Sequence, residues 1–135
     1  MAVKFSVAVR NARLDALETA IGTSAVLKIR SGSAPTNITD ADSGTVLATL
    51  SLPSDWMANA ASGPKSKSGT WQDTSADNTG TAAHFRLYAS DGTTQHMQGS
   101  ITATGGGGDM TVDNTSFVAG QSFTVTAFTL TDGNG

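Results

Sequence analysis

The stretch that decides the fold is Ala82–Thr104, AAHFRLYASDGTTQHMQGSITAT. Apolar and polar residues alternate on either side of its centre, and this period of two is typical of β-strands with one buried face. The central Ser90-Asp91-Gly92 combines residues that favour turns with a glycine that tolerates a left-handed backbone. The stretch therefore predicts a β-hairpin.

The two faces of this hairpin are expected to differ in character. The side chains predicted to point into the core are those of Ala83, Phe85, Leu87, Met97, Gly99, Ile101 and Ala103. Those predicted to point outward are His84, Arg86, Tyr88, His96, Gln98, Ser100 and Thr102. Opposed residues in a ladder lie on the same face, so the loop must contain an odd number of residues. A three-residue loop with Gly92 in a bulge satisfies this condition and pairs Leu87 with Gln95 and Phe85 with Met97.

The N-terminal segment has a different period. Its larger apolar residues recur at the spacing of a helix; they are Val7, Leu14, Leu17 and Ile21. Ser6 is a suitable N-cap, and Gly22 stands where helices commonly end in a left-handed residue. These features predict one helix over residues 7–21.

The remaining sequence reads as short strands separated by turns. Strands are expected at residues 25–31, 45–52, 70–74, 109–113 and 121–131, and loops at 31–43 and at 58–69, the latter exposed and mobile. The apolar alternation in the last strand changes phase, which predicts a bulge near Ala127. The tail, residues 132–135, is expected to fray. With no βαβ rhythm, the pattern predicts a mainly β chain: a single domain over 1–135, in which a helix at 7–21 precedes an antiparallel β-sandwich or jelly-roll-like unit at 25–131.

The composition narrows the possible partners. Only 14% of the residues are charged and the formal net charge is −3, a balance that disfavours nucleic acid. The chain has no cysteine, which excludes disulfides, thiolate metal sites and cysteine nucleophiles. The first residues lack the apolar core of a signal peptide, and no stretch reaches the roughly 20 apolar residues of a membrane span. We expect neither a nucleic-acid nor a membrane partner.

Few residues in the sequence suggest a catalytic or metal-binding site. His84 and His96 would form a metal or proton-relay pair if they met on one face, but a plain polar strand face is the simpler interpretation. Asp40-x-Asp42-x-Gly44 resembles the start of a calcium loop but lacks the later glutamate, so turn formation explains it better. We therefore expect no enzyme activity, no cofactor and no bound metal.

The aromatic residues leave two interpretations open. Trp56, Trp71 and Tyr88 would make a platform for a sugar if they were exposed together on one face. The alternative is that they belong to the core or anchor a protein contact.

Two stretches resemble small structural proteins encoded among the head genes of tailed bacteriophages. The first is Leu14–Gly32, LDALETAIGTSAVLKIRSG. The second is HFRLYASDGTTQHMQGSITATGGGGDMTVDN from His84, followed by FTVTAFTLT at Phe123–Thr131. The order of helix, charged alternating strand, Asp-Gly hairpin, glycine run and threonine-rich last strand is similar over nearly the whole chain, with the exception of residues 58–78.

This resemblance implies a capsid decoration, or cement, protein. Such a protein is made in the host cytoplasm, binds the outside of the shell of the major capsid protein, and is expected to be a homodimer or homotrimer on the virion surface. The alternative is a receptor- or glycan-binding module of a phage tail fibre or spike. The residues that we expect at a protein interface are Arg10, Arg13, Lys65, Lys67, His84, Arg86, Tyr88 and His96.

Overall fold

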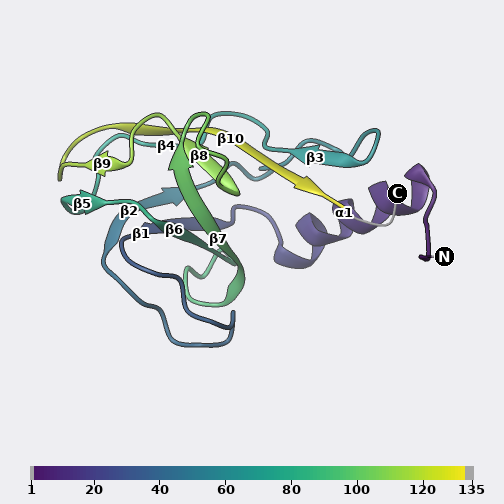
Figure 1. Cartoon of the computed structure of the whole chain (residues 1–135), viewed down its shortest axis with the longest axis horizontal. Coiled ribbons are helices and arrows are strands. Elements are labelled where there is room, and N and C mark those ends of the chain that lie inside the picture. The colour runs from purple at the N-terminus through teal and green to yellow at the C-terminus, as the bar shows by residue number, and fades with distance from the viewer. Residues whose placement is uncertain (1, 133–135) are drawn as a thin grey trace.

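A computed structural model describes residues 2–132 of the chain. Helix α1 (Val7–Ile21) is followed by strands, which Figure 1 shows curling around one another beside the helix. The strands are β1 (Val26–Arg30), β2 (Val46–Ser51), β3 (Pro64–Ser66), β4 (Gln72–Asp73), β5 (Gly80–Thr81), β6 (His84–Tyr88), β7 (Gln95–Ala103), β8 (Met110–Val112), β9 (Ser116–Phe117) and β10 (Phe123–Thr131). Of the tail predicted to fray, residues 132–135, Asp132 is held by an ion pair with Arg13, and residues 133–135 lie outside the described residues.

The strands form a curled, β-sandwich-like sheet, and the mainly β class with one N-terminal helix is confirmed. The order of strands is β2-β1-β6-β7-β8-β10-β3, with β4 also paired to β10, and β5 pairs with β9 apart from this sheet. One pair departs from the expected antiparallel pattern, because β7 and β8 run parallel. The glycine run between them folds the chain back along β7, so that β8 starts beside Ile101 and runs in the same direction as β7. In this turn Gly106 and Gly108 lie close to Thr102, and a Cβ atom on them would come within 2.7 and 2.9 Å of Thr102, respectively.

The hydrophobic core lies on the inner face of this sheet. Leu27 and Ile29 of β1 face it together with Phe85 and Leu87 of β6, as the alternation predicts. The sheet closes over a group of aromatic rings, in which Trp71 lies 6.1 Å from Trp56 and 5.7 Å from Phe128. Both tryptophans are almost completely buried and belong to this core.

Helix α1 begins and ends where the sequence predicts. The Ser6 side chain accepts a hydrogen bond from Val9 N, and Gly22 ends the helix with a positive φ. The expected apolar face is only half correct, since Leu14 and Ile21 are buried whereas Val7 and Leu17 are exposed. The reason is that the helix extends past the end of the sheet and packs mainly on the short strand β3 (Figure 1).

At its centre the hairpin β6–β7 has the predicted faces but another register, and at its ends Ala83 and Ala103, which the sequence predicts to point inward, are exposed. Leu87 pairs with Met97 and Phe85 with Gly99, two residues further along β7 than predicted. Gly92 is left-handed as expected, and the side chain of Asp91 accepts hydrogen bonds from the backbone of the turn. The pairing shifts between Leu87 and Tyr88, so the extra residue, His96, is a bulge in the strand rather than part of a three-residue loop.

The last strand confirms the change of phase that the sequence predicts. The pairing of β10 with β8 shifts between Val125 and Ala127. This bulge turns Val125 and Phe128 to the same buried side, although three positions separate them. Strand β10 therefore contributes side chains to the core along its length, and its C-terminal end lies near helix α1.

Candidate interaction surface

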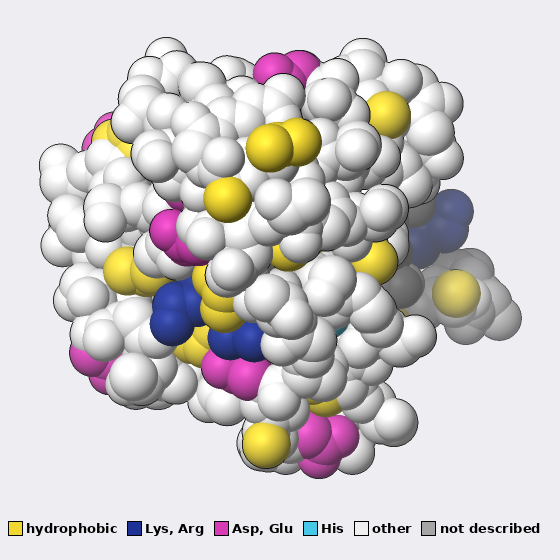
Figure 2. Space-filling model, turned by 90° about the vertical axis from the view of Figure 1, so that its left-hand side faces the viewer, with side chains coloured by type: hydrophobic (Ala, Val, Ile, Leu, Met, Phe, Trp, Pro, Cys, Tyr) yellow, Lys and Arg dark blue, Asp and Glu magenta, His cyan; other side chains and the backbone are white. Residues whose placement is uncertain are grey.

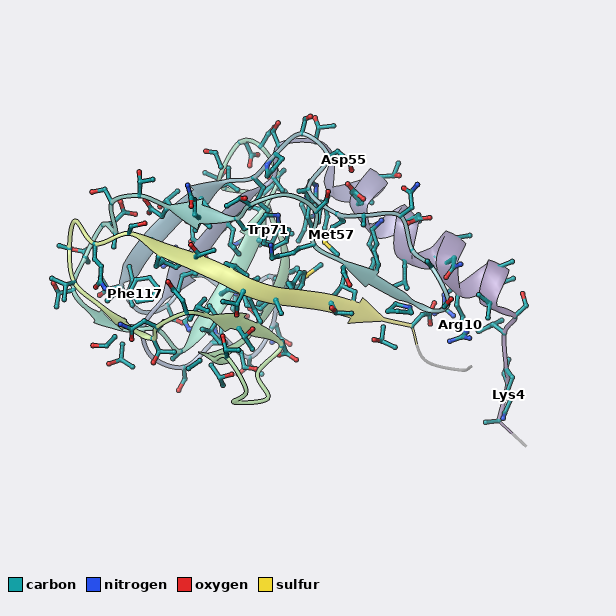
Figure 3. The ribbon with its side chains drawn as sticks, turned by 90° about the horizontal axis from the view of Figure 1, so that it is seen from above. Lys4, Arg10, Asp55, Met57, Trp71 and Phe117 are labelled. Carbon is teal, nitrogen blue, oxygen red and sulfur yellow. The ribbon has the colours of Figure 1, made fainter. Side chains whose placement is uncertain are left out.

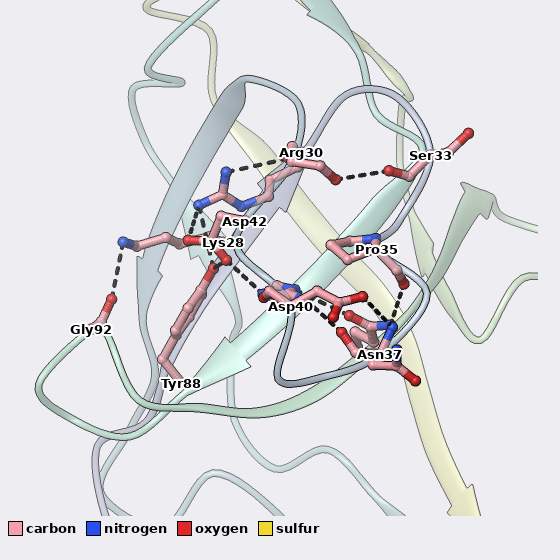
Figure 4. A network of polar contacts seen from close by, with 12 residues as sticks. Lys28, Arg30, Ser33, Pro35, Asn37, Asp40, Asp42, Tyr88 and Gly92 are labelled. Atoms are coloured by element: carbon pink, nitrogen blue, oxygen red, sulfur yellow. Dashed lines mark hydrogen bonds and ion pairs between the residues drawn. The ribbon is translucent and has the colours of Figure 1, made fainter.

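The polar face of β1, β6 and β7 is covered by the chain itself. The loop of residues 31–43, here called the 31–43 loop, crosses this face and contacts it with backbone carbonyls and one carboxylate (Figure 4). Gln98 donates to the carbonyl of Pro35 at 2.7 Å. The loop therefore forms a second layer over the strand face that the sequence predicts to be free.

Arg86 lies at the centre of this layer and has no exposed surface. Its guanidinium donates to the carbonyls of Asn37 and Asp40 at 3.1 and 2.9 Å, and to Oδ1 of Asp42 at 2.9 Å. Its Nε donates to the Gln98 side chain at 3.1 Å. A buried charge is tolerated when it is paired and hydrogen-bonded in this way.

Asp42 joins three strand residues to the loop. Arg30 Nη2 donates to its Oδ2 at 2.8 Å, and the hydroxyl of Tyr88 donates to its Oδ1 at 2.7 Å (Figure 4). Partial burial opposes ionisation of Asp42, but the hydrogen bonds from Tyr88 and Arg86 lower its pKa overall. The carboxylate therefore stays charged at neutral pH and is shared by two arginines.

His84 is the fourth polar residue under the 31–43 loop. It is 2% exposed, and its Nδ1–H donates to the carbonyl of Gly32 at 2.8 Å. Its Nε2 is buried, and no group in residues 2–132 hydrogen-bonds to it. Burial lowers the pKa of His84 below its usual value, and the charges of Arg30 and Arg86 add to this effect.

Three of the predicted interface residues are thus unavailable to a partner in this structure. His84, Arg86 and Tyr88 are each at most 2% exposed, because the 31–43 loop occupies their face. Alternation identified a face that is not the hydrophobic core, but it does not say what covers that face. The sequence signal for the cover is the pair of arginines, Arg30 and Arg86, which need a carboxylate, with Asp42 as a candidate in the adjacent loop.

The second histidine, His96, lies in the bulge of β7 and is exposed as predicted. The interpretation of the two histidines as a metal pair finds no support, because among residues 2–132 no three His, Asp or Glu side chains lie close enough to hold an ion. Asp40 acts in a turn, where its side chain accepts a hydrogen bond from Asn37 N. Its neighbour Asp42 is occupied by the arginines.

Lys65 holds helix α1 to the sheet, which corrects the prediction that residues 58–69 form an exposed loop. The region contains β3, and Lys65 is 1% exposed. Its Nζ lies 2.7 Å from the carboxylate of Asp15, 2.9 Å from that of Glu18 and 2.9 Å from the carbonyl of Ala58. Burial would lower the pKa of Lys65, but its hydrogen bonds to Asp15 and Glu18 raise it overall. Lys65 is therefore a structural ion-pair residue and not a free cation.

The other predicted basic residues are more accessible. Lys67 is half-buried and donates to the carbonyl of Gly69. The side chain of Arg13 is 51% exposed, pairs with Asp132 at 3.1 Å and lies 5.0 Å from the centre of the Phe5 ring. Arg10 is half-buried against Gly63, near the free end of the helix (Figure 3).

Five of the six large apolar side chains that are exposed among residues 2–132 belong to the N-terminal segment and helix α1, and the sixth is Val118. The five are Val3, Phe5, Val7, Val9 and Leu17, and together they are here called the N-terminal apolar surface, although helical spacing turns Val7 and Val9 to nearly opposite sides of α1. Exposed groups of this kind mark interaction sites in folded proteins. Lys4 and Arg13 accompany them, whereas both carboxylates of the helix, Asp15 and Glu18, are turned toward Lys65. The surface is thus apolar with basic residues and is a candidate for binding a partner.

The opposite end of the molecule has a different character. Figure 3 places Lys4 and Arg10 at one end of the long axis and Phe117 at the other. Figure 2 shows the latter end, where most of the surface is backbone and neutral polar side chain. Val118 is exposed near this end and lies next to β9. It serves below as a matched control for the N-terminal apolar surface.

No protein-family model, no curated protein and no solved structure matches this chain. Among the helices described, none is long and apolar enough to cross a membrane.

Proposed function

We propose that this protein is a decoration, or cement, protein of a tailed-phage head, which binds the outside of the major capsid protein shell. The similarity of pattern in Leu14–Gly32 and in the segments from His84 to Thr131 supports this proposal. The fold suits the role, since a rigid sheet with few loose side chains presents a fixed surface to many identical sites. No catalytic centre is needed for this function.

The observation that carries the proposal is the N-terminal apolar surface. Val9 and Leu17 are 44% and 41% exposed on a helix that extends past the sheet, and Val3 is 69% exposed on the segment before it. Full burial of an exposed large apolar side chain contributes about 1.5–3 kcal/mol, so Val9 and Leu17 can each contribute about half of that before the cost of association. Lys4 lies on the same segment, whereas Arg13 is already paired with Asp132, so these side chains fit a capsid surface that is mainly apolar.

The tryptophans bear on the alternative function, a glycan- or receptor-binding module. Trp56 and Trp71 are 0% and 1% exposed, and their ring nitrogens donate to the carbonyls of Gly22 and Ser68. A sugar platform needs exposed aromatic faces, and Tyr88 is also buried. The aromatic residues therefore favour the cement function over the glycan function.

A cement protein would stabilise the shell because its binding is thermodynamically linked to the association of the capsid subunits. If one copy contacts two capsid subunits, their separation also breaks the decoration contact, so the shell is more stable when the protein is bound. A homodimer or homotrimer would multiply this effect, because after one contact forms the others become effectively intramolecular. Each single contact can then be weak.

The proposal is tested by co-sedimentation with expanded heads that lack this protein. We expect the wild-type chain to bind and to raise the temperature at which the heads break open. The double variant Val9→Gln and Leu17→Gln should bind at least about tenfold more weakly, because two apolar contacts are lost. The matched control is Val118→Gln, an equally exposed apolar residue near the opposite end. A wild-type chain that does not bind heads would overturn the function, and equal binding by the double variant would overturn the assigned surface.

A further inference from the structure

The polar layer under the 31–43 loop contains an imbalance of charge. Arg30 and Arg86 are both buried and both pair with one carboxylate, that of Asp42. Asp42 also accepts the hydroxyl of Tyr88, so its two oxygens already accept three hydrogen bonds. Two buried guanidiniums therefore share one carboxylate, which has little capacity to accept a further hydrogen bond.

His84 lies beside both arginines in this layer. It is directly opposite Arg30 in the β1–β6 ladder and two residues from Arg86 on the same face of β6. Its Nδ1–H is satisfied by Gly32 of the loop, and its buried Nε2 has no partner among the described residues. The neutral ring fits this site, since Nε2 then carries only a lone pair.

We propose that His84 makes the 31–43 loop an acid-sensitive latch, closed while the imidazole is neutral and opened when it is protonated. Protonation places a third positive charge beside two guanidiniums and creates a buried Nε2–H donor with no acceptor. Opening of the loop admits water to both groups and uncovers Arg30, Arg86 and Tyr88. The opened face is basic and polar.

The groups around His84 support this direction of the response. Strand β1 contributes Arg30, β6 contributes Arg86 and Tyr88, and the loop contributes the carboxylate of Asp42. Strand β7 faces this site with the neutral Ser100, opposite His84, and with Gln98, opposite Arg86. Asp42 and the Gly32 carbonyl favour the charged ring, but burial and the two arginines outweigh them.

The sign of the pH dependence follows from this balance. The pKa of His84 is below 6.5 in the closed molecule and returns toward that value when the loop is open and solvated. The open form then binds more protons, so acid favours opening. The latch is fully closed above about pH 6.5, and the open population rises by up to about tenfold for each pH unit below it until the lowered pKa is reached.

The experiment is a histidine and amide NMR titration of the full chain from about pH 8 to about pH 5. We expect His84 to titrate below the ordinary histidine value of about 6.5. Amide shifts and faster hydrogen exchange in residues 31–43 should follow the His84 curve. Amides of the core strands β1 and β6 should stay protected over this range.

Two matched variants separate the latch from general acid effects. His84→Asn keeps an amide donor for Gly32 but cannot be protonated, so acid opening of the loop should be lost. His96→Asn should leave the opening unchanged. Acid opening that persists in His84→Asn would overturn the proposal. If that variant does not fold, the wild-type titration decides alone, and a loop that stays closed while His84 titrates, or a His84 that titrates at its ordinary value of about 6.5, overturns it.

Discussion

The guanidinium of Arg86, which has no exposed surface, lies 2.9 Å from the carboxylate of Asp42 across the two layers of the molecule. Arg86 belongs to the central strand β6, and Asp42 to the 31–43 loop. This contact helps to hold the polar 31–43 loop on the sheet, together with the half-buried Pro35 and Ile38. It also makes the folded state dependent on a single carboxylate, because Arg30 uses the same one.

Replacement of Asp42 should therefore be costly. Asp42→Asn leaves two buried guanidiniums without a counter-charge, and we expect the free energy of unfolding to fall by about 3 kcal/mol, the low end for a broken buried pair because Asp42 is partly exposed. Denaturation with urea measures this. The control is Asp40→Asn in the same loop, where only a hydrogen bond from Asn37 N is affected and about 1 kcal/mol or less is expected. Equal losses in the two variants would contradict this account of the loop.

A second prediction concerns the attachment of helix α1. Lys65→Met keeps the buried stem but removes the contacts to Asp15, Glu18 and Ala58 and leaves their oxygens without this donor. We expect a loss of about 2 kcal/mol and increased hydrogen exchange in the helix, while the sheet stays protected. Lys67→Met, two residues away on a half-buried side chain, should change stability by no more than about 0.5 kcal/mol. If Lys67→Met were the more damaging variant, Lys65 would not be the residue that holds the helix.

The ion pairs around Asp42 and around Lys65 could not be predicted from the sequence. The caps at Ser6 and Gly22, the strand alternation and the bulge near Ala127 depend on neighbouring residues, and the structure confirms them. The burial of Lys65 and Arg86 depends on segments distant in sequence. A basic residue in a polar segment is expected in solvent, and only the packing of Asp15 and Asp42 against those residues reverses that expectation.

The predicted register of the hairpin β6–β7 is wrong for a related reason. The rule that opposed residues share a face holds, and Leu87 does oppose an inward residue, Met97. This rule is satisfied by an extra residue in the loop and equally by one in the strand, so the rule alone does not predict where the extra residue lies. The structure places the extra residue at His96, where an exposed side chain costs no core packing.

A third prediction concerns the stability of the folded protein at acidic pH. Hydrogen bonds from Thr94 and Thr93 in the turn lower the pKa of Asp91 to about 2. A lowered pKa means that the folded state favours the carboxylate, so this stabilisation is complete above about pH 4 and is lost as the pH falls toward about 2. Asp91→Asn should weaken the pH dependence of unfolding in this window and leave it about the same nearer neutral pH. An Asp91 carboxyl that titrates near its ordinary value by NMR would contradict it.

The last prediction concerns the packing that closes the core between β7 and β6. Gly99 lies opposite Phe85, and a Cβ atom there would come within 2.8 Å of the Phe85 ring and 2.9 Å of the Asp109 carboxylate. Neither neighbour can move easily, since the ring packs edge-on against Phe128 and the carboxylate accepts the backbone and hydroxyl of the residue after Gly99. We expect Gly99→Ala to reduce the free energy of unfolding by about 1–3 kcal/mol.

The matched control is Gly80→Ala on β5, a glycine that also has an ordinary backbone conformation. A Cβ atom there would come no closer than 3.0 Å to any neighbour, the end of the buried Leu47 side chain. The loss in Gly80→Ala should be smaller, about 1 kcal/mol, because one neighbour has to give by only a few tenths of an ångström. Urea denaturation of both variants compares the two sites directly. A Gly99→Ala chain as stable as the wild type would mean that Phe85 and Asp109 are held less firmly than the contacts with Phe128 and the β7 backbone require.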